Sequence, residues 1–295
     1  MKKYIFLIFI FFNKILLLAN QVEIINLPLA RSLSLASETA LINNRSFNVL
    51  TNPSMLYRID SGYNLEFNKL FYYADSGYNL LGLSIKEADG NVSFVFGNFS
   101  SGKLKVFNIE GNETGEVVEY TVSLLAVGFS SKISSSKNYD LYLGLSGYGI
   151  FEKINIESQY WGGNVGLVYE RRLNNKIFKS LNIGSVIKGF GMNSNLMHNE
   201  AVSLEMNRIK FIFGYQNYYP KKTEDNYKAG VSCIIYQSKN KNYNIILDLG
   251  YNFGFYNESF SCGFEIKIKN ILINYSFANH SYLSGLHNLF LSFKL

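Results

Sequence analysis

Hydrophobic and polar positions alternate along most of the chain from residue 62 onward. The clearest run spans 243–253, where Tyr, Ile, Leu and Phe fill the odd positions and Asn, Asp or Gly most of the even ones. Because side chains alternate across a strand with a period of two, such a run predicts a strand with one apolar and one polar face. It is also long enough to cross a bilayer as a tilted strand, which needs about 9–11 residues.

The stretch 286–295 repeats this pattern. Asn288, Ser292 and Lys294 share its polar face, and Phe290 is the one apolar exception there. A membrane barrel must pair its last strand with its first, because an open sheet edge leaves backbone groups without partners in lipid. We therefore predict that this strand closes a barrel against a first strand near Tyr63–Phe67. Its lipid-facing residues would be Leu289, Leu291, Phe293 and Leu295.

About 14 or 15 strand candidates follow residue 61, separated by turn-like sequences such as 100–103 and 111–115. Barrels made from one chain usually have an even number of strands, so we predict an all-β fold, a transmembrane antiparallel β-barrel of about 14 strands over 62–295. The pattern is weakest between 192 and 216. A soluble β-sandwich or barrel with the same alternation is the alternative.

Composition favours the membrane barrel over the soluble one. The chain has 22 Tyr and 24 Phe, and 17% of its residues are charged, against about 25% in soluble domains. Tyr and Phe favour strands and membrane interfaces. The net charge of +6 is spread over single residues and short pairs rather than a basic run, which argues against nucleic acid as a partner.

The N-terminal residues indicate that the protein is exported, and those that follow form a segment distinct from the barrel. Residues 1–20 combine Lys2 and Lys3 with two apolar runs, as a signal peptide does. The alternative is an uncleaved anchor, but Asn13 and Lys14 interrupt the roughly 20 apolar residues that a spanning helix needs. Export and a membrane barrel together predict the outer membrane of a Gram-negative-type bacterium.

Residues 21–61 lack strong alternation, and we predict that they form a periplasmic or lumenal segment that plugs the barrel. Asn52 and Pro53 form a rigid turn signal, since Pro fixes its own φ and biases the preceding residue to extended geometry. The alternative is that this turn is merely the corner into the first strand. Arg31, expected inside the lumen, needs a carboxylate or carbonyl partner, and the lumen-facing Glu66 or Glu265 could serve.

The residues that could carry catalysis or bind a metal are few. His280 and His287 flank a serine-rich stretch, but no G-x-S-x-G motif occurs and no acidic residue lies nearby in the sequence. Cys233 and Cys262 lie on apolar faces with a predicted strand between them, roughly 10 Å apart, too far for a disulfide. We predict no enzyme, no cofactor and no metal site, and place His287 at the rim or in the lumen as a hydrogen-bonding group.

Several short motifs resemble the PorV/PorQ-like outer-membrane family. Ala30-Arg31-Ser32-Leu33 is followed by Asn52-Pro53-Ser54-Met55-Leu56, in the manner of that family's N-terminal region. The other matching elements are Leu181-Asn182-Ile183-Gly184, Gly189-Phe190-Gly191, Gly230-Val231, Leu249-Gly250-Tyr251-Asn252, Asn274-Tyr275-Ser276-Phe277, and Leu283, His287, Leu289 and Leu291. The chain departs from the family at 34–38, which replaces a Gly-rich run, at Ser54 in place of Ala, and at Leu295 in place of a final aromatic residue.

This resemblance implies a 14-stranded barrel related to the FadL-type fatty-acid transporters, with the N-terminal segment inside. It suggests two functions: passing or binding a hydrophobic small molecule, or serving as a barrel component or shuttle of a type IX-like secretion system. The expected partners are outer-membrane lipid, the barrel-assembly machinery, and a hydrophobic ligand or a secreted protein.

Overall fold

The structure is a computed structural model of the chain. It describes residues 29–36, 38–59, 62–71, 76–87, 90–102, 104–107, 110, 113–153, 157–173, 175, 177–191, 196–219, 225–240, 242–253, 259–279 and 285–295. The predicted signal peptide and His280 lie outside these residues. Among the described residues, no helix is both long enough and apolar enough to cross a membrane.

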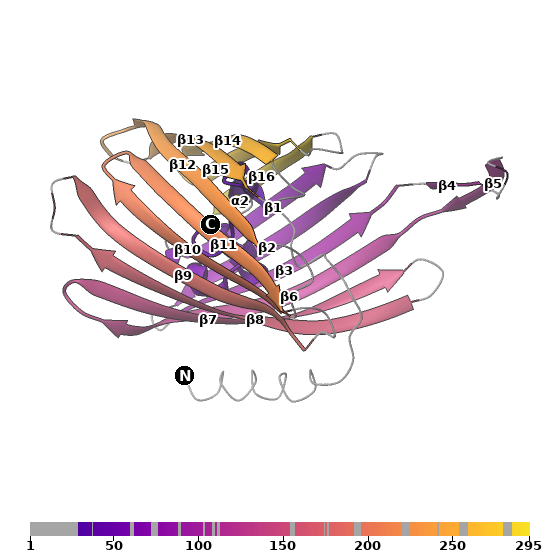
Figure 1. Ribbon diagram of the computed structural model, residues 1–295, viewed down its shortest axis with the longest axis horizontal. Coiled ribbons are helices and arrows are strands. Elements are labelled where there is room, and N and C mark those ends of the chain that lie inside the picture. Colours follow the sequence, from indigo (N-terminus) through magenta and orange to yellow (C-terminus); the bar gives the residue numbers. More distant parts are fainter. Residues whose placement is uncertain are drawn as a thin grey trace.

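Fourteen antiparallel strands form a closed barrel (Figure 1), as the alternation predicts. Neighbours in sequence are neighbours in the wall, except that β3 pairs with β6 and β1 pairs with β16. The first eight are β1 Tyr63–Phe71, β2 Gly77–Glu87, β3 Gly90–Ser100, β6 Thr121–Ser135, β7 Tyr139–Lys153, β8 Glu157–Arg172, β9 Phe178–Phe190 and β10 Leu196–Met206. The others are β11 Ile209–Tyr219, β12 Asn226–Gln237, β13 Tyr243–Asn252, β14 Ser259–Ile268, β15 Ile271–Ala278 and β16 Leu286–Lys294.

The last strand closes the barrel against the first, as predicted. Leu65 lies opposite Phe293, and Phe67 lies opposite Leu291. Phe290 occupies the polar face because that face looks inward, where its ring packs edge-on against Phe47 with centroids 5.9 Å apart. We call the end of the barrel that holds Tyr63 and Leu295 the turn end, and the opposite end the loop end.

The outward faces of the strands are apolar. Phe213, Phe96 and Leu249 expose 62%, 53% and 52% of their surface, while their chain neighbours in the wall face inward. A soluble domain rarely exposes so much contiguous apolar surface, whereas a lipid-facing wall requires it. The burial pattern therefore supports the membrane barrel over the soluble alternative.

The connection between β3 and β6 is more ordered than the turn signals predict. β4 Leu104–Phe107 pairs with β5 Glu113–Val118 in a two-stranded ribbon outside the barrel sheet. Figure 1 shows this ribbon projecting beyond the wall at the loop end. Lys105 and Glu113 form an exposed ion pair across it at 3.0 Å.

Residues 29–59, here called the inner segment, lie within the barrel. They contain the helix α2 (Ala30–Ser34) and two 3-10 helices, η2 (Arg45–Val49) and η3 (Pro53–Arg58). Helix α2 packs against β13 to β16, η2 against β2 and β3, and η3 against β6 to β8. A segment that touches strands on opposite sides of a closed barrel must lie inside it, and most of its residues are fully buried.

Candidate functional site

Wall glycines allow the inner segment to approach the strands closely. A Cβ on Gly144 would lie 2.0 Å from the Ser54 amide nitrogen, and one on Gly166 would lie 1.8 Å from Asn52 Oδ1. Any side chain there would displace the segment. Inward glycines of other strands also lie against it, namely Gly82, Gly128, Gly184, Gly214, Gly230, Gly250 and Gly263.

Asn52 and Pro53 form the turn that sits on these glycines. Asn52 caps η3: its Oδ1 accepts hydrogen bonds from the Ser54 amide at 3.1 Å and the Ser54 hydroxyl at 2.6 Å. Its Nδ2 donates to the Ala40 carbonyl at 2.6 Å. Pro53 begins η3, where its missing N–H costs nothing. Since residues 52–54 are buried against β7 and β8, the turn is part of the contact between segment and wall.

Arg31 points from α2 to the wall, but its main partner is a residue that sequence reasoning missed. Arg31 donates to Asp248 at 3.0 Å and to Ser232 at 2.8 Å, while Glu265 lies 3.9 Å away. Burial alone would lower the pKa of Arg31, but the charges of Asp248 and Glu265 outweigh it, and that pKa is raised. Asp248 is the one carboxylate on the polar face of the clearest strand run, which is the signal that could have identified it.

Glu66 was proposed as a partner of Arg31, and that assignment is wrong. Its carboxylate accepts a hydrogen bond from the Ser46 amide at 2.8 Å and another from the Ser46 hydroxyl. Glu66 faces inward as predicted, but from β1 it meets η2, whereas Arg31 points to β12 and β13. Sequence alternation identifies the face of a strand but not which part of the segment lies opposite it.

Of the two positions predicted for His287, the rim and the lumen, the lumen is wrong. It lies on the outward face of β16 near the loop end, in hydrogen-bond contact with the Tyr275 hydroxyl at 2.6 Å. Period-two alternation puts position 287 on the same face as 289, 291 and 293, so the pattern itself contains the correct answer. His287 therefore contributes nothing to the lumen.

Both cysteines are free thiols. Cys233 lies opposite Leu247 and Cys262 opposite Leu249, so β13 separates them as the sequence predicts. No group of three His, Cys, Asp or Glu that could hold a metal ion occurs among the described residues.

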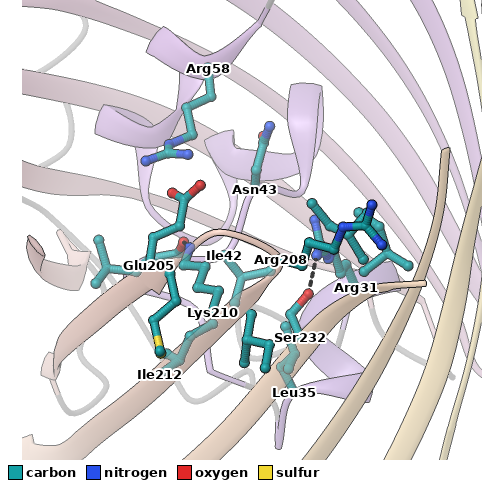
Figure 2. A pocket seen from close by; sticks show the side chains of 15 residues that line it. Arg31, Leu35, Ile42, Asn43, Arg58, Glu205, Arg208, Lys210, Ile212 and Ser232 are labelled. Carbon is teal, nitrogen blue, oxygen red and sulfur yellow. Dashed lines mark hydrogen bonds between the residues drawn. The ribbon is translucent and has the colours of Figure 1, made fainter. Parts of the chain in front are cut away.

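A cavity of about 200 Å³ lies between the inner segment and the turn ends of β10 to β13. Figure 2 shows Arg58 and Glu205 pointing toward one another across it, with Arg31 beside Ser232. Arg58 also donates to Tyr57 at 2.6 Å and lies 3.4 Å from Glu170. The remaining lining combines Arg208, Lys210 and Asn43 with apolar residues, namely Leu35, Leu41, Ile42, Met206, Ile209, Ile212, Ile234 and Ile246. The cavity lining thus mixes charged, polar and apolar side chains.

The loop end of the interior has a different character. Tyr78, Phe99 and Tyr120 form a chain of aromatic contacts with centroid distances of 4.4 and 5.6 Å. These rings and Tyr160 are partly buried and pack against an apolar cluster formed by inward wall residues and by the inner segment. The Tyr120 hydroxyl donates to Glu152 at 2.8 Å. Aromatic faces edged by hydroxyl groups suit an apolar, aromatic guest molecule.

The barrel resembles solved outer-membrane channels in fold. No protein-family model matches the sequence, and a search of the curated proteins finds no match. The Pseudomonas putida toluene transporter TodX superposes with a TM-score of 0.59 at 10% identity, over 88% of this chain and 96% of that one. The Ralstonia pickettii toluene transporter TbuX gives 0.58 at 10%, over 89% and 96%. The CymD monoaromatic hydrocarbon channel gives 0.57 at 10%, over 92% and 98%. At such identities the likeness concerns the fold alone, a closed antiparallel β-barrel of similar length.

Proposed function

We propose that this chain is an outer-membrane barrel that binds and passes a hydrophobic small molecule. The observation that carries the proposal is the inward aromatic cluster of Tyr78, Phe99, Tyr120 and Tyr160 at the loop end. Outer-membrane barrels have short turns on the periplasmic side and longer loops outside, so the loop end would face outward and an apolar solute would reach these rings before the inner segment. The named channels that share the fold are toluene transporters and monoaromatic hydrocarbon channels, which favours transport over a role in protein secretion.

In this proposal the inner segment acts as a barrier to the solute. Directly below the aromatic cluster, Phe47, Val49, Leu50 and Leu56 of the segment join the apolar residues of the wall in one buried cluster. A solute held by the rings is therefore adjacent to the segment, and further passage depends on that contact. Membership of the PorV/PorQ-like family and export by residues 1–20 remain predictions.

Uptake of radiolabelled toluene by cells expressing the protein tests the proposal. Phe99→Ala removes the middle ring of the aromatic cluster. We expect it to lower the initial uptake rate about fivefold, since a contact between two aromatic rings contributes about 0.5–1.5 kcal/mol to binding. Phe96→Ala is the matched control, because Phe96 lies on the same strand but faces outward with 53% exposure. Equal uptake by both variants, at equal amounts in the outer membrane, would show that the inward ring plays no part.

A further inference from the structure

The inner wall carries polar atoms that the closed barrel leaves without partners. Fourteen side-chain nitrogen and oxygen atoms are buried and have no hydrogen-bond partner within the described part of the chain. They belong to eleven Asn and Ser residues, all on inward strand faces: Asn64, Asn68, Ser84, Ser93, Ser130, Asn182, Asn199, Asn244, Asn252, Asn274 and Asn288. The described part of the inner segment contributes none of them.

The inner segment, in contrast, has hydrogen bonds within itself in addition to those it makes to the wall. The Ser32 amide donates to Asn44 Oδ1 at 3.3 Å, and Asn48 Nδ2 donates to Asn43 Oδ1 at 3.0 Å. The bond from Asn52 to the Ala40 carbonyl joins η3 to the chain that follows α2. These bonds tie α2, η2 and η3 into one unit, so the segment can move as a body and keep its internal hydrogen bonds.

The unpaired wall atoms lie where the segment covers the wall. Asn64 and Asn68 flank Glu66, which holds Ser46. Ser130 lies directly across from Gly144, which touches the Asn52-Pro53-Ser54 turn. Asn244 is the one exception. Each of the other ten residues contacts the segment itself or lies close to a wall residue that does. In the second case it is at most two positions away on the same strand, or directly opposite on the neighbouring strand. Burying such atoms without partners is unfavourable, and water would satisfy them once the segment moved away.

The wall cannot refill the space that the segment occupies. At Gly82, Gly144, Gly166 and Gly250 the wall has no side chains to reach inward. After the segment leaves, the lumen would be wide and lined by many Gly, Ser, Asn and charged residues, with apolar residues such as Leu80 and Ile150 among them. Its polar share is that of a surface able to hold water, as in the interior of an aqueous pore.

We propose that the barrel has a second, water-filled state, in which the inner segment leaves the wall as a unit and the lumen conducts ions and small hydrophilic solutes. This activity goes beyond the passage of a hydrophobic molecule. The segment is held by its bonds to the wall, above all by Arg31 on the buried Asp248, with Ser146 and Asn164 donating to the Val49 carbonyl at 2.7 and 3.1 Å. The open state is accordingly the minor one in the wild-type chain.

A reversible cross-link between segment and wall tests this directly in the full chain. A Cβ at Gly230 would lie 3.4 Å from Leu35 Cβ, close to the roughly 3.5–4.5 Å that a disulfide spans. The protein carries Leu35→Cys and Gly230→Cys in a background with Cys233→Ala and Cys262→Ala, so that only the designed pair can oxidise. The readout is current in planar lipid bilayers with potassium chloride as the only conducted species.

We expect intermittent openings from the reduced form, none from the oxidised form, and their return when dithiothreitol is added to the same bilayer. Because one molecule serves in both states, a folding defect cannot imitate this result. In the cysteine-free background, Asp248→Asn should raise the open probability about tenfold, since it breaks a buried ion pair. The proposal is wrong if the reduced form and the Asp248→Asn variant are both silent, or if oxidation leaves the current unchanged. Bilayer current with potassium chloride does not measure toluene binding at Phe99, so the two proposals fail separately.

Discussion

The sharpest stability prediction concerns Gly144, where the wall meets the Asn52-Pro53-Ser54 turn. In Gly144→Ala the new Cβ would lie 2.0 Å from the Ser54 nitrogen and 2.2 Å from the Pro53 carbonyl carbon, against 3.4 Å for an ordinary contact. One of the two backbones must move by about 1.4 Å, the difference between those distances. Neither can yield by a rotamer change, so we expect the upper part of the usual overpacking cost, about 3 kcal/mol.

Gly147→Ala is the control on the same strand. Its Cβ would have only the Gly162 carbonyl oxygen near it, at 3.9 Å, and replacing Gly by Ala within a strand gains about 0.5–1 kcal/mol. Urea unfolding in lipid vesicles, followed by Trp161 fluorescence, should therefore separate the two variants by about 3–4 kcal/mol. Limited proteolysis should cut residues 29–59 faster in Gly144→Ala. Unfolding free energies that agree within about 0.5 kcal/mol would refute the close approach of segment and wall.

Two further predictions concern the wall and the pH dependence of the segment. Leu247→Arg introduces a charge on the outward face in the middle of β13 and should lower the free energy of unfolding by about 2–4 kcal/mol. Tyr243→Arg, at the turn end of the same strand, should lower it by only about 0–1 kcal/mol. Unfolding in vesicles and heat-modifiable gel migration measure both variants. Burial raises the pKa of Glu38 above its ordinary 4.5, so the stability linked to this group is present below pH 4.5 and is lost as the pH rises through the raised value. Proteolysis of the segment in the wild-type chain should therefore become faster as the pH rises from acid to neutral, and in Glu38→Gln its rate should depend less on pH. Proteolysis rates that change with pH in the same way in both proteins would contradict this.

Local pattern determined the barrel itself. The alternation at 243–253 and 286–295 decided which side chains face lipid, and the need to pair edge strands decided that β16 meets β1. Both follow from rules that act between residues close in sequence or from the absence of water in a bilayer, so no distant contact has to be known. The same rule would have placed His287 outward.

Only the tertiary structure decided what the inner segment touches. Which carboxylate holds Arg31, and which glycine lies under the Asn52-Pro53 turn, depend on how a segment without regular periodicity is rotated and shifted inside the barrel. That placement is fixed by steric fit to the whole wall, including strands more than two hundred residues away along the chain. The β4–β5 ribbon depends likewise on pairing across a loop whose sequence signals only turns. Period-two patterning specifies the faces of strands, but not the position of a body packed against those faces.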